Sequence, residues 1–274
     1  MFKNWWIFFC FCIVVKISIV IVEYNSLDEL QRCAESLQKG FSFDVELIAS
    51  SNSCYPKEKQ DEAQSRFPQF RWSFNEKNGG FAYAMNQGLK LATGDYLIIA
   101  NPDCVFIDKL DEMVAFLQQH PEVGAIAPQI VDECGQVQDS CRHYVSVQSF
   151  IWRQIRRKLT GSEVMLNSRV DYSKVQTVDW VIGAFIMVSR AVYEKTGGLS
   201  DDYFMYAEDM DWCTRICLAG WEVVYYPKVK IQYKGTRSAR KNSVSAKIFL
   251  KSLKTYWKRF GFFWGYPNRK KIVY

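Results

Sequence analysis

The feature that most constrains the fold of this 274-residue chain is a set of short apolar runs in its first part, each followed at once by polar side chains. Residues 16–22 (KISIVIV) form a continuous β-branched run, as in a strand buried on both faces of a parallel sheet. Further candidate strands lie at 45–49 and 96–100, and helical spacing at 27–38 and 81–91 separates the runs. This alternation predicts an α/β fold with a doubly wound, mostly parallel sheet.

Polar residues follow three of these strands at the point where each strand ends. Tyr24 and Asn25 follow the first strand, residues 50–53 the second, and Asn101-Pro102-Asp103 the strand at 96–100. Ligands of doubly wound sheets bind beyond the carboxyl ends of the strands. We therefore expect the three polar clusters to converge on one edge of the sheet and to form a ligand site.

The second half of the chain has a less regular pattern. Its expected elements are, in order, a helix at 110–119, a strand at 123–127, a strand region at 178–189, a helix at 207–218 and a strand at 221–226. Residues 132–178 are rich in charged residues and serine, with little periodicity, and they predict a mobile loop on the acceptor side of a binding site.

Two acidic positions are candidates for chemistry. Asp103 follows a buried strand, where its carboxylate can hold Mg²⁺ or Mn²⁺, and the cation can neutralise a diphosphate leaving group. Asp209 follows the aromatic run at 204–206, so it can lie at a partly dry pocket wall and accept a proton from an attacking hydroxyl. Each also has a simpler interpretation, as a turn former and as a helix-start acid respectively.

The chain resembles the family 2 inverting glycosyltransferases, in particular the bacterial rhamnosyltransferase-like enzymes of cell-surface polysaccharide assembly. The resemblance covers roughly residues 17 to 240. It rests on the order and spacing of five segments: 20–26, 78–89 (NGGFAYAMNQGL), 94–103 (GDYLIIANPD), 178–190 and 197–220.

This resemblance implies a GT-A fold in which a donor half (17–105) and an acceptor half (106–245) are fused. It implies a nucleoside-diphosphate sugar as donor, and Mg²⁺ or Mn²⁺ as cofactor. The acceptor would be a hydroxyl of a glycan or lipid-linked saccharide in surface polysaccharide synthesis. The reaction would be a single in-line displacement that inverts the anomeric carbon.

The same resemblance assigns roles to individual residues. Asp103 matches the last acid of the family's Asp-x-Asp element, and Asp209 matches the second acid of its Glu-Asp motif, the expected base. The expected donor-binding residues are Tyr24, Asn25, Ser50, Asn78, Gly80, Asn86 and Asn101. The expected acceptor-side residues are Trp180, Gly183 and Glu208.

Two positions depart from the family pattern. Ser50-Ser51 stand where the family usually has an Asp-Asn pair that contacts the nucleotide, so that negative charge is absent. Tyr233 stands where the family often has a His near the metal and diphosphate. We expect Tyr233, or its neighbours Lys234, Arg237 and Ser238, to provide the diphosphate contacts, as Arg and Lys commonly do.

The two ends of the chain differ from the rest. Residues 1–16 are expected to be a short apolar extension translated from an upstream start codon. The apolar run at 5–15 is shorter than the ~20 residues of a membrane span. Residues 246–274 are basic and aromatic, and they are consistent with a helix packed on the core with a solvated charged face or with a helix that rests on anionic lipid. We favour the contact with lipid, because acceptors of the family are often lipid-linked.

The bulk composition limits the location and the partners. The nine cysteines show no metal-site spacing and are interpreted as reduced thiols, which predicts a cytoplasmic protein. The basic stretch near the carboxyl terminus allows a peripheral contact with the inner face of the cell membrane. The net charge of +6 is concentrated near the carboxyl terminus, but no nucleic-acid-binding motif accompanies it, so nucleic acid is not an expected partner.

Two other functions remain alternatives. A sugar-phosphate nucleotidyltransferase is disfavoured, because that class has a Gly-rich loop with an Arg after the first strand and this chain has Glu23-Tyr24-Asn25-Ser26. A glycosyltransferase-like binding module that has lost activity is consistent with the replacements at Ser50 and Tyr233. Retention of both Asp103 and Asp209 argues against it.

Overall fold

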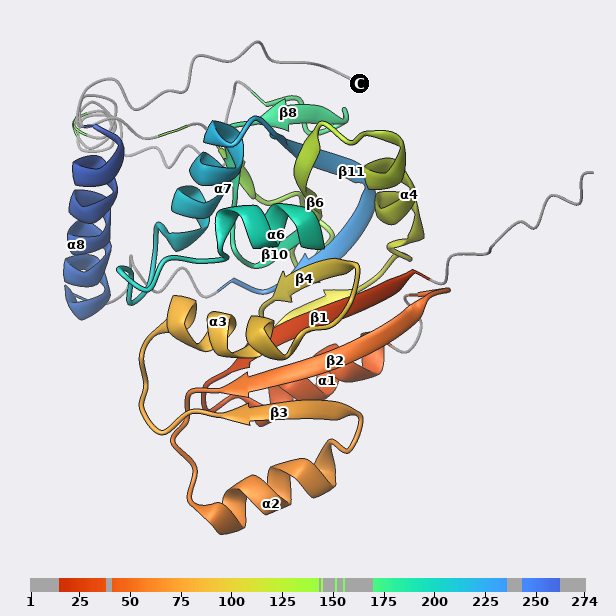
Figure 1. Cartoon of the computed structure of the whole chain (residues 1–274), viewed down its shortest axis with the longest axis vertical. Helices are drawn as coiled ribbons and strands as arrows, with labels where there is room; N and C mark the ends of the chain where they lie inside the picture. Colours follow the sequence, from red (N-terminus) through yellow and green to blue (C-terminus); the bar gives the residue numbers. More distant parts are fainter. Residues whose placement is uncertain are drawn as a thin grey trace, which may run out of the picture.

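The computed structural model describes residues 15–37, 41–142, 144, 151, 155, 170–235 and 243–261. The fold is built around β1 (Lys16–Glu23), which is buried on both faces. Ile17, Ile19 and Ile21 pack into one hydrophobic core, whereas Val20 packs into a second core on the other side of the sheet. This alternation follows from the two-residue period of a strand, and it makes β1 a central strand with layers of helices on both sides (Figure 1).

The first half of the chain forms a parallel arrangement in the order β3-β2-β1-β4. Its remaining elements are α1 (Leu27–Leu37), β2 (Asp44–Ser51), α2 (Lys57–Arg66), β3 (Phe70–Phe74), α3 (Phe81–Leu91) and β4 (Tyr96–Ala100). The strands expected here, and the helices at 27–38 and 81–91, are confirmed to within two residues. The helix α2 was not among the expected elements.

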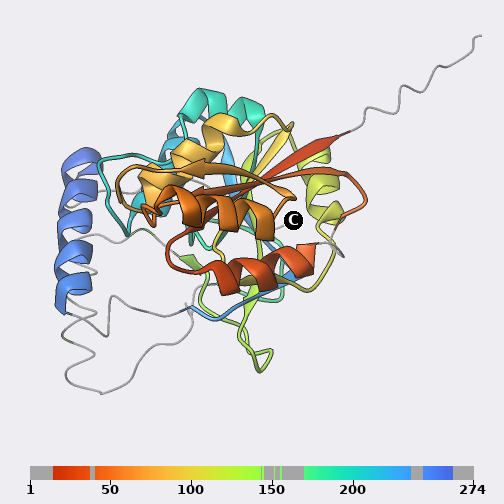
Figure 2. The same cartoon turned by 90° about the horizontal axis from the view of Figure 1, so that it is seen from below.

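The order of these strands creates a topological switch point. The chain steps from β1 outward to β2 and β3, and then returns through α3 to pair β4 with the other side of β1. The buried residues of α1 and α3 belong to different cores, so the two helices cover opposite faces of the sheet (Figure 2). Ligands of open α/β sheets bind at such a switch point, here between the carboxyl ends of β1 and β4.

The second half continues the same sheet as β4-β10-β6-β11-β5, with β8 beside β11. The elements are β5 (Cys104–Phe106), α4 (Asp111–Gln119), β6 (Val123–Val131), β8 (Gln176–Val178), β10 (Phe185–Ser189), α6 (Arg190–Thr196), α7 (Glu208–Leu218) and β11 (Glu222–Tyr233). The strand β10 runs antiparallel to both β4 and β6, and β11 runs parallel to β6 but antiparallel to β5 and β8. The α/β class is confirmed, and the sheet is mixed, with its parallel part concentrated in the first half.

Several boundaries differ from the expectations. The strand expected at 221–226 extends to Tyr233, because a register shift after Tyr226 lets β11 resume its pairing with β6. The region 132–178, expected to be a loop, contains β8 and also β7 (Cys141–Arg142), which pairs with β9 (Trp180–Val181) in a small second sheet. Much of the remainder of that region, including 145–150 and 156–169, lies outside the described residues.

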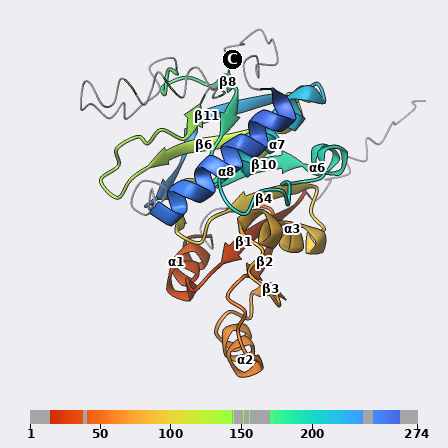
Figure 3. The same ribbon diagram turned by 90° about the vertical axis from the view of Figure 1, so that its left-hand side faces the viewer.

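The ends of the described chain bear on the expected extensions. Val15 is buried and Lys16 opens β1, so the expected extension overlaps the first core strand, and residues 1–14 lie outside the described part. The last described helix, α8 (Ser243–Phe260), packs Leu253 and Tyr256 into the core that contains α7 (Figure 3). None of the helices in the described part of the chain combines the length and the apolar character needed to span a bilayer, and the cysteines described there are free thiols.

Candidate active site

The turn Asn101-Pro102-Asp103 lies between β4 and β5 at the switch point. The N–H of Cys104 donates to the carbonyl of Asn101 (3.2 Å), and the N–H of Asn101 donates to the carbonyl of Ala184 (3.1 Å). Asp103 is partly buried at this edge of the sheet. Burial raises the pKa of its carboxyl group, while hydrogen bonding to the backbone of Gly235 opposes that shift. The turn thus presents one restrained carboxylate to the ligand edge.

Tyr233 lies beside this turn because β11 pairs with β5. Its Cα is in register with Cys104, and its hydroxyl accepts a hydrogen bond from Nδ2 of Asn101 (3.1 Å). Burial raises the pKa of the Tyr233 hydroxyl, and the negative charges of Asp103 and Asp209 raise it further. The two aspartates singled out in the sequence therefore lie within electrostatic range of one hydroxyl group.

Asp209 lies in the first turn of α7. Its Oδ2 accepts a hydrogen bond from the N–H of Gly183 (2.9 Å), and its Oδ1 accepts one from the N–H of Met210 (2.7 Å). Burial raises the pKa of this carboxyl group, while these hydrogen bonds and the charge of Arg142 oppose the shift. The carboxylate is held in one orientation by backbone donors on two sides.

Glu208 is the buried neighbour of Asp209. Only 6% of its surface is exposed, and its Oε2 accepts no hydrogen bond from the described residues. Burial, followed by the negative charge of Asp209, raises its pKa well above the ordinary range. Because an unpaired buried carboxylate is costly in free energy, burial favours the protonated form of Glu208, whereas the backbone donors of Gly183 and Met210 favour the ionised form of Asp209.

The segment before α7 is strained and is joined to the donor half. Tyr206 and Ala207 have left-handed backbone angles (φ 70° and 66°), which cost on the order of 1 kcal/mol each for residues other than glycine. The carbonyl of Phe204 accepts a hydrogen bond from the N–H of Phe81 (2.8 Å). A Cβ on Gly80 (φ 92°) would collide with that carbonyl, so glycine is required there.

The acceptor side contains an arginine that the sequence reasoning missed. In the β7–β9 pair, Arg142 is in register with Trp180, and its guanidinium lies 5.4 Å from the centroid of the indole ring. Asp139 pairs with the same guanidinium (Nε–Oδ2 3.4 Å). Trp180, Gly183 and Glu208, the expected acceptor-side residues, thus come together with Arg142 near Asp209. Nothing in the aperiodic sequence around residue 142 signalled this, because it depends on the pairing with β9.

A second missed residue is Glu23 at the end of β1. Its carboxylate is fully buried and accepts hydrogen bonds from the hydroxyls of Ser51 (2.5 Å), Ser53 (2.9 Å) and Tyr55 (3.0 Å). It also accepts one from the N–H of Ser26 (2.8 Å). A charged residue that ends a buried strand was the available signal. Glu23 joins the loops after β1 and β2, on the side where the donor was expected.

The loop after β2 lies on a network of amide side chains. Nδ2 of Asn52 donates to the carbonyl of Gly80 (2.8 Å) and to Oδ1 of Asn78 (3.2 Å), and Oδ1 of Asn52 accepts from Asn75 (3.1 Å). Ser50, expected to bind the donor, is fully buried and its hydroxyl accepts from Nδ2 of Asn75 (3.2 Å). Ser50 and Asn52 are therefore buried members of the network, and Asn78 is exposed at the loop surface.

The other expected donor residues differ in their placement. Tyr24 is 55% exposed, and the N–H of its neighbour Asn25 donates to the hydroxyl of Ser53 (2.7 Å). The amide of Asn86 is occupied within the protein, since its Nδ2 donates to the carbonyl of Leu199 and to Asp201 (2.7 Å each). Asn86 therefore joins α3 to the loop before α7, and we do not retain it as a donor ligand.

The basic candidates after β11 are only partly visible. Lys234 is exposed and pairs with Glu133 (3.4 Å). Arg237 and Ser238 lie outside the described residues. Among the described residues, the surface hollows at α4 are lined by Glu112, Phe116 and Lys228, none of which belongs to this edge of the sheet.

A divalent cation fits the chemistry of this edge, although the described part of the chain contains no group of three metal-binding side chains. Mg²⁺ is usually held by one or two carboxylates together with substrate phosphates and water. The single restrained carboxylate of Asp103 meets that requirement, and the diphosphate of a donor would supply further oxygen ligands.

The chain is similar in sequence to known glycosyltransferases. The family model of glycosyl transferase family 2 matches residues 18–197. The chain is 26% identical over 243 residues to N-acetylglucosaminyl-diphospho-decaprenol L-rhamnosyltransferase of Mycobacterium tuberculosis, which covers 83% of this chain and 78% of the relative. It is 26% identical over 158 residues to rhamnosyltransferase WbbL of Escherichia coli, over 57% of this chain and 58% of the relative.

Solved structures share the fold at low sequence identity. GalNAc-T7 with UDP, GalNAc and Mn²⁺ aligns with a TM-score of 0.58 and 18% identity, over 80% of this chain and 43% of the larger one. The mannosyltransferase PcManGT of Pyrobaculum calidifontis, in complex with GDP-Man and Mn²⁺, aligns with a TM-score of 0.58 and 16% identity, over 88% of this chain and 64% of the other. The chain therefore has the GT-A fold, belongs to glycosyl transferase family 2, and is a glycosyltransferase similar to bacterial rhamnosyltransferases.

Proposed function

We propose that this chain transfers a sugar, in particular a deoxyhexose such as rhamnose, from a nucleoside-diphosphate sugar to a hydroxyl of a lipid-linked saccharide, with inversion at the anomeric carbon. The observation that carries this proposal is the pair Gly183 and Ala184. The N–H of Gly183 donates a hydrogen bond to Asp209, and the carbonyl of Ala184 accepts one from the N–H of Asn101 in the Asp103 turn. The names of two relatives, which specify rhamnosyl transfer and in one case a decaprenol-linked N-acetylglucosamine, support this class of donor and acceptor.

Asp209 acts as the base in this proposal. The acceptor hydroxyl attacks the anomeric carbon and gives its proton to Asp209. The bond from that carbon to the phosphate oxygen breaks, and its electron pair leaves with the nucleoside diphosphate. The backbone donors of Gly183 and Met210 hold the carboxylate in place, and positioning of this kind reduces the entropy cost of the reaction. Burial favours the protonated form of Glu208, and the two backbone donors favour the ionised form of Asp209 that a base requires.

Asp103 holds the divalent cation, with Tyr233 beside it. When bound, the cation offsets the negative charge that develops on the leaving diphosphate. The roles of the chain's own residues here are to present one carboxylate and to restrain it, through the contacts of Asn101 with Ala184 and Tyr233. Mg²⁺ and Mn²⁺ both satisfy an oxygen donor set of this kind.

The nucleotide contacts the loops after β1 and β2. Tyr24 is an exposed aromatic side chain at the carboxyl end of β1, and it is suited to stack on a base. Asn78 offers an exposed amide group on a neighbouring loop, and the buried Asn52 holds it there. The buried carboxylate of Glu23 accepts hydrogen bonds from Ser51 and Ser53. These bonds hold the loop after β2 in shape although it lacks the Asp that the family usually has at Ser50.

The solvent face of α8 contacts anionic lipid at the inner face of the cell membrane, where a lipid-linked acceptor resides. Lys247, Lys251, Lys254 and Lys258 are all exposed, and Leu250 beside them is 51% exposed. A lysine near an anionic surface contributes about 1 kcal/mol. Replacement of all four by Gln is expected to abolish salt-sensitive sedimentation with phosphatidylglycerol vesicles. Unchanged sedimentation would exclude α8 as the contact.

The function is tested by transfer assays with UDP-, GDP- and dTDP-sugars in the presence of Mn²⁺ or Mg²⁺, with a lipid-linked or soluble saccharide acceptor. Asp209→Asn is expected to lower kcat by roughly 10²- to 10⁴-fold, the usual contribution of a general base. Asp103→Asn is expected to remove the stimulation by Mn²⁺. The anomeric configuration of the product, measured by NMR, is expected to be the inverse of that of the donor.

Asp61→Asn provides the matched control, because Asp61 is exposed on α2 and pairs only with Lys57 at the surface among its described contacts. Donor binding is followed separately by ligand-induced thermal stabilisation. Binding without turnover for any donor and acceptor would instead identify the chain as an inactive binding module. Full activity of Asp209→Asn would overturn the assignment of the base.

A further inference from the structure

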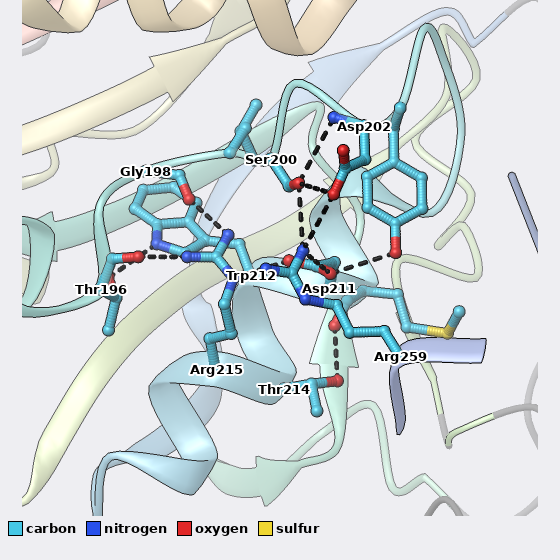
Figure 4. A network of polar contacts seen from close by, with 12 residues as sticks. Thr196, Gly198, Ser200, Asp202, Asp211, Trp212, Thr214, Arg215 and Arg259 are labelled. Carbon is cyan, nitrogen blue, oxygen red and sulfur yellow. Dashed lines mark hydrogen bonds and ion pairs between the residues drawn. The ribbon is translucent and has the colours of Figure 1, made fainter. Parts of the chain in front are cut away.

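A buried ion-pair network lies two residues beyond the proposed base. The side chain of Asp211 is completely buried and pairs with Nε of Arg215 on the same helix (2.6 Å) and with Nη1 of Arg259 on α8 (3.1 Å). The hydroxyl of Tyr203 donates to the same carboxylate (3.1 Å) (Figure 4). One carboxylate thus joins α7, α8 and the loop that leads into α7.

Arg259 also reaches that loop directly. Its Nη1 donates to the hydroxyl of Ser200 (3.0 Å) and lies 3.6 Å from Oδ2 of Asp202. Figure 4 shows the guanidinium lying between the loop and the first turns of α7. A single side chain of α8 therefore fixes the loop and the catalytic helix relative to each other.

Three further contacts of α8 flank the strained residues Tyr206 and Ala207. The hydroxyl of Ser252 donates to the carbonyl of Met205 (2.8 Å). The hydroxyl of Tyr256 is 2.9 Å from Oγ1 of Thr214, and the ring of Phe249 packs edge-on against Tyr206 (5.8 Å between centroids). The contacts of α8 thus fall on both sides of the left-handed pair that precedes Asp209.

Strained backbone persists only where its surroundings hold it in place. The carbonyl of Ala207 accepts the hydrogen bond from the N–H of Asp211 (2.8 Å), so the left-handed turn and the first turn of α7 form one unit. If α8 no longer held Met205 and Asp211, this unit could relax toward ordinary backbone angles. Asp209, which lies between the two held positions, would then move away from Gly183.

We propose that α8 is part of the catalytic site and that Arg259 is a positioning residue, which holds the strained Tyr206–Ala207 turn so that Asp209 faces the acceptor. This proposal rests on the role of Asp209 given under the proposed function. It extends the catalytic unit beyond residue 245, past the residues 18–197 that match the family model.

The network allows this role to be separated from folding. Arg215 remains paired with Asp211 when Arg259 is replaced, so the buried carboxylate keeps a cationic partner. Arg259 itself is partly exposed, with 40% of its side chain accessible. Arg259→Met is therefore expected to fold, whereas Asp211→Asn would leave Arg215 without its charge partner and is a poorer test.

The experiment compares Arg259→Met and Arg259→Lys with the matched control Arg66→Met. Arg66 lies on α2, has a side chain of similar exposure (39%) and pairs with Asp28 at the surface. Transfer is measured at a temperature well below the melting point of every variant. Arg259→Met is expected to lower kcat about tenfold or more, as small misplacements of a catalytic group do. The dissociation constant of the donor is expected to stay unchanged, and Arg259→Lys is expected to recover part of kcat.

Hydrogen exchange of the segment 203–211 supplies a readout that does not depend on activity. Exchange there is expected to increase in Arg259→Met and not in Arg66→Met. Unchanged kcat and unchanged exchange in Arg259→Met would overturn the proposal, as would a loss of kcat that matches the loss of folded protein. If instead Asp209→Asn were fully active, the assignment of Asp209 as the base would fail, while faster exchange in Arg259→Met would still show that α8 holds the turn.

Discussion

The backbone N–H of Gly183 donates a hydrogen bond of 2.9 Å to Oδ2 of Asp209, and this contact determines the orientation of the proposed base. The next residue, Ala184, accepts from the N–H of Asn101 (3.1 Å). Because β10 runs antiparallel to β4, its first residues lie at the carboxyl end of β4. The start of one strand therefore brings the two acidic segments of the site together.

Two glycines of the site are expected to respond differently to an added methyl group. In Gly183→Ala the Cβ would lie 3.4 Å from Cβ of Asp209 and 3.7 Å from its Oδ2, which are ordinary contact distances. The fold should persist, and the methyl group should obstruct the approach of the acceptor. We expect kcat/KM for the acceptor to fall about tenfold, since small displacements near reacting atoms are costly.

Gly80→Ala is the contrasting variant. Its φ of 92° and the close Phe204 carbonyl leave no room for Cβ, so we expect a loss of roughly 1–3 kcal/mol in the free energy of unfolding. Thermal and denaturant unfolding measure both variants. Equal stability of the two would contradict the close approach of the loop to Gly80.

As the pH is lowered, the transfer activity is expected to fall at a pH above the ordinary pKa of an aspartate. Burial raises the pKa of Asp209 above 3.8, and a base must be ionised to act. The acidic limb of the pH dependence of kcat/KM should therefore lie at higher pH than that of an exposed carboxylate. Among the charged neighbours of Asp209, Arg142 lowers the pKa of Asp209. The charge of Asp209 in turn raises the pKa values of Glu208 and Tyr233.

Replacement of Arg142 tests this sign. Arg142→Met removes the charge that favours ionised Asp209, so the acidic limb should move to higher pH. Arg142→Lys should leave it closer to that of the wild type. A limb that moves to lower pH in Arg142→Met would show that another group limits the rate.

Glu208→Gln is expected to stabilise the protein at neutral and alkaline pH. The folded-state pKa of Glu208 is raised above its unfolded value, so its favourable contribution is complete below the unfolded pKa and is lost as the pH rises. The amide of Gln does not ionise, so the variant does not lose this stability as the pH rises. A gain of about 1 kcal/mol would raise Tm by roughly 2–4 °C at pH 8, and the gain should vanish near pH 4.

The matched control for that variant is Glu62→Gln, since Glu62 is exposed on α2. Its Tm should show no comparable dependence on pH. A Glu208→Gln protein that is less stable than the wild type at pH 8 would show that Glu208 is ionised and paired in the folded protein.

Tyr233→Phe is expected to weaken donor binding. The substitution removes the hydroxyl that accepts from Asn101 (3.1 Å), and an unmade hydrogen bond of this kind costs about 1 kcal/mol. The freed Asn101 amide and the Asp103 turn should become less ordered, and KM for the donor should rise roughly fivefold. Tyr226→Phe, on the same strand but bonded to Glu112, should leave that KM unchanged. Equal effects of both substitutions would exclude a specific role for Tyr233.

The donor half of the fold was predictable because its signals are local. The apolar run at 16–22 and the helical spacing at 81–91 each report on a few consecutive residues, and the structure confirms both elements. The position of Asp103 after a buried strand likewise followed from one short segment. Its proximity to Asp209 did not, since it depends on the antiparallel entry of β10 into the sheet.

The residues that were missed share one property. Glu23 and Arg142 acquire their roles through partners such as Ser51 and Trp180, which lie far away in the sequence. Arg259 was interpreted as one charge in a basic tail, but in the structure it contacts a buried carboxylate on another helix. Asn86 was expected at the donor, and its amide is occupied by a loop whose approach no local pattern reports.

The sequence by itself determined the α/β class, the parallel first half and the family, because the period of apolar residues and the order of short motifs are properties of neighbouring residues. Only the tertiary structure decided that Gly183 and Ala184, just before β10, join the Asp103 turn to Asp209, that Tyr233 lies within electrostatic range of both acids, and that α8 contacts the strained turn before Asp209. The physical reason is that these contacts depend on strand order, strand direction and helix packing, which are decided by the burial of whole faces and not by any single segment.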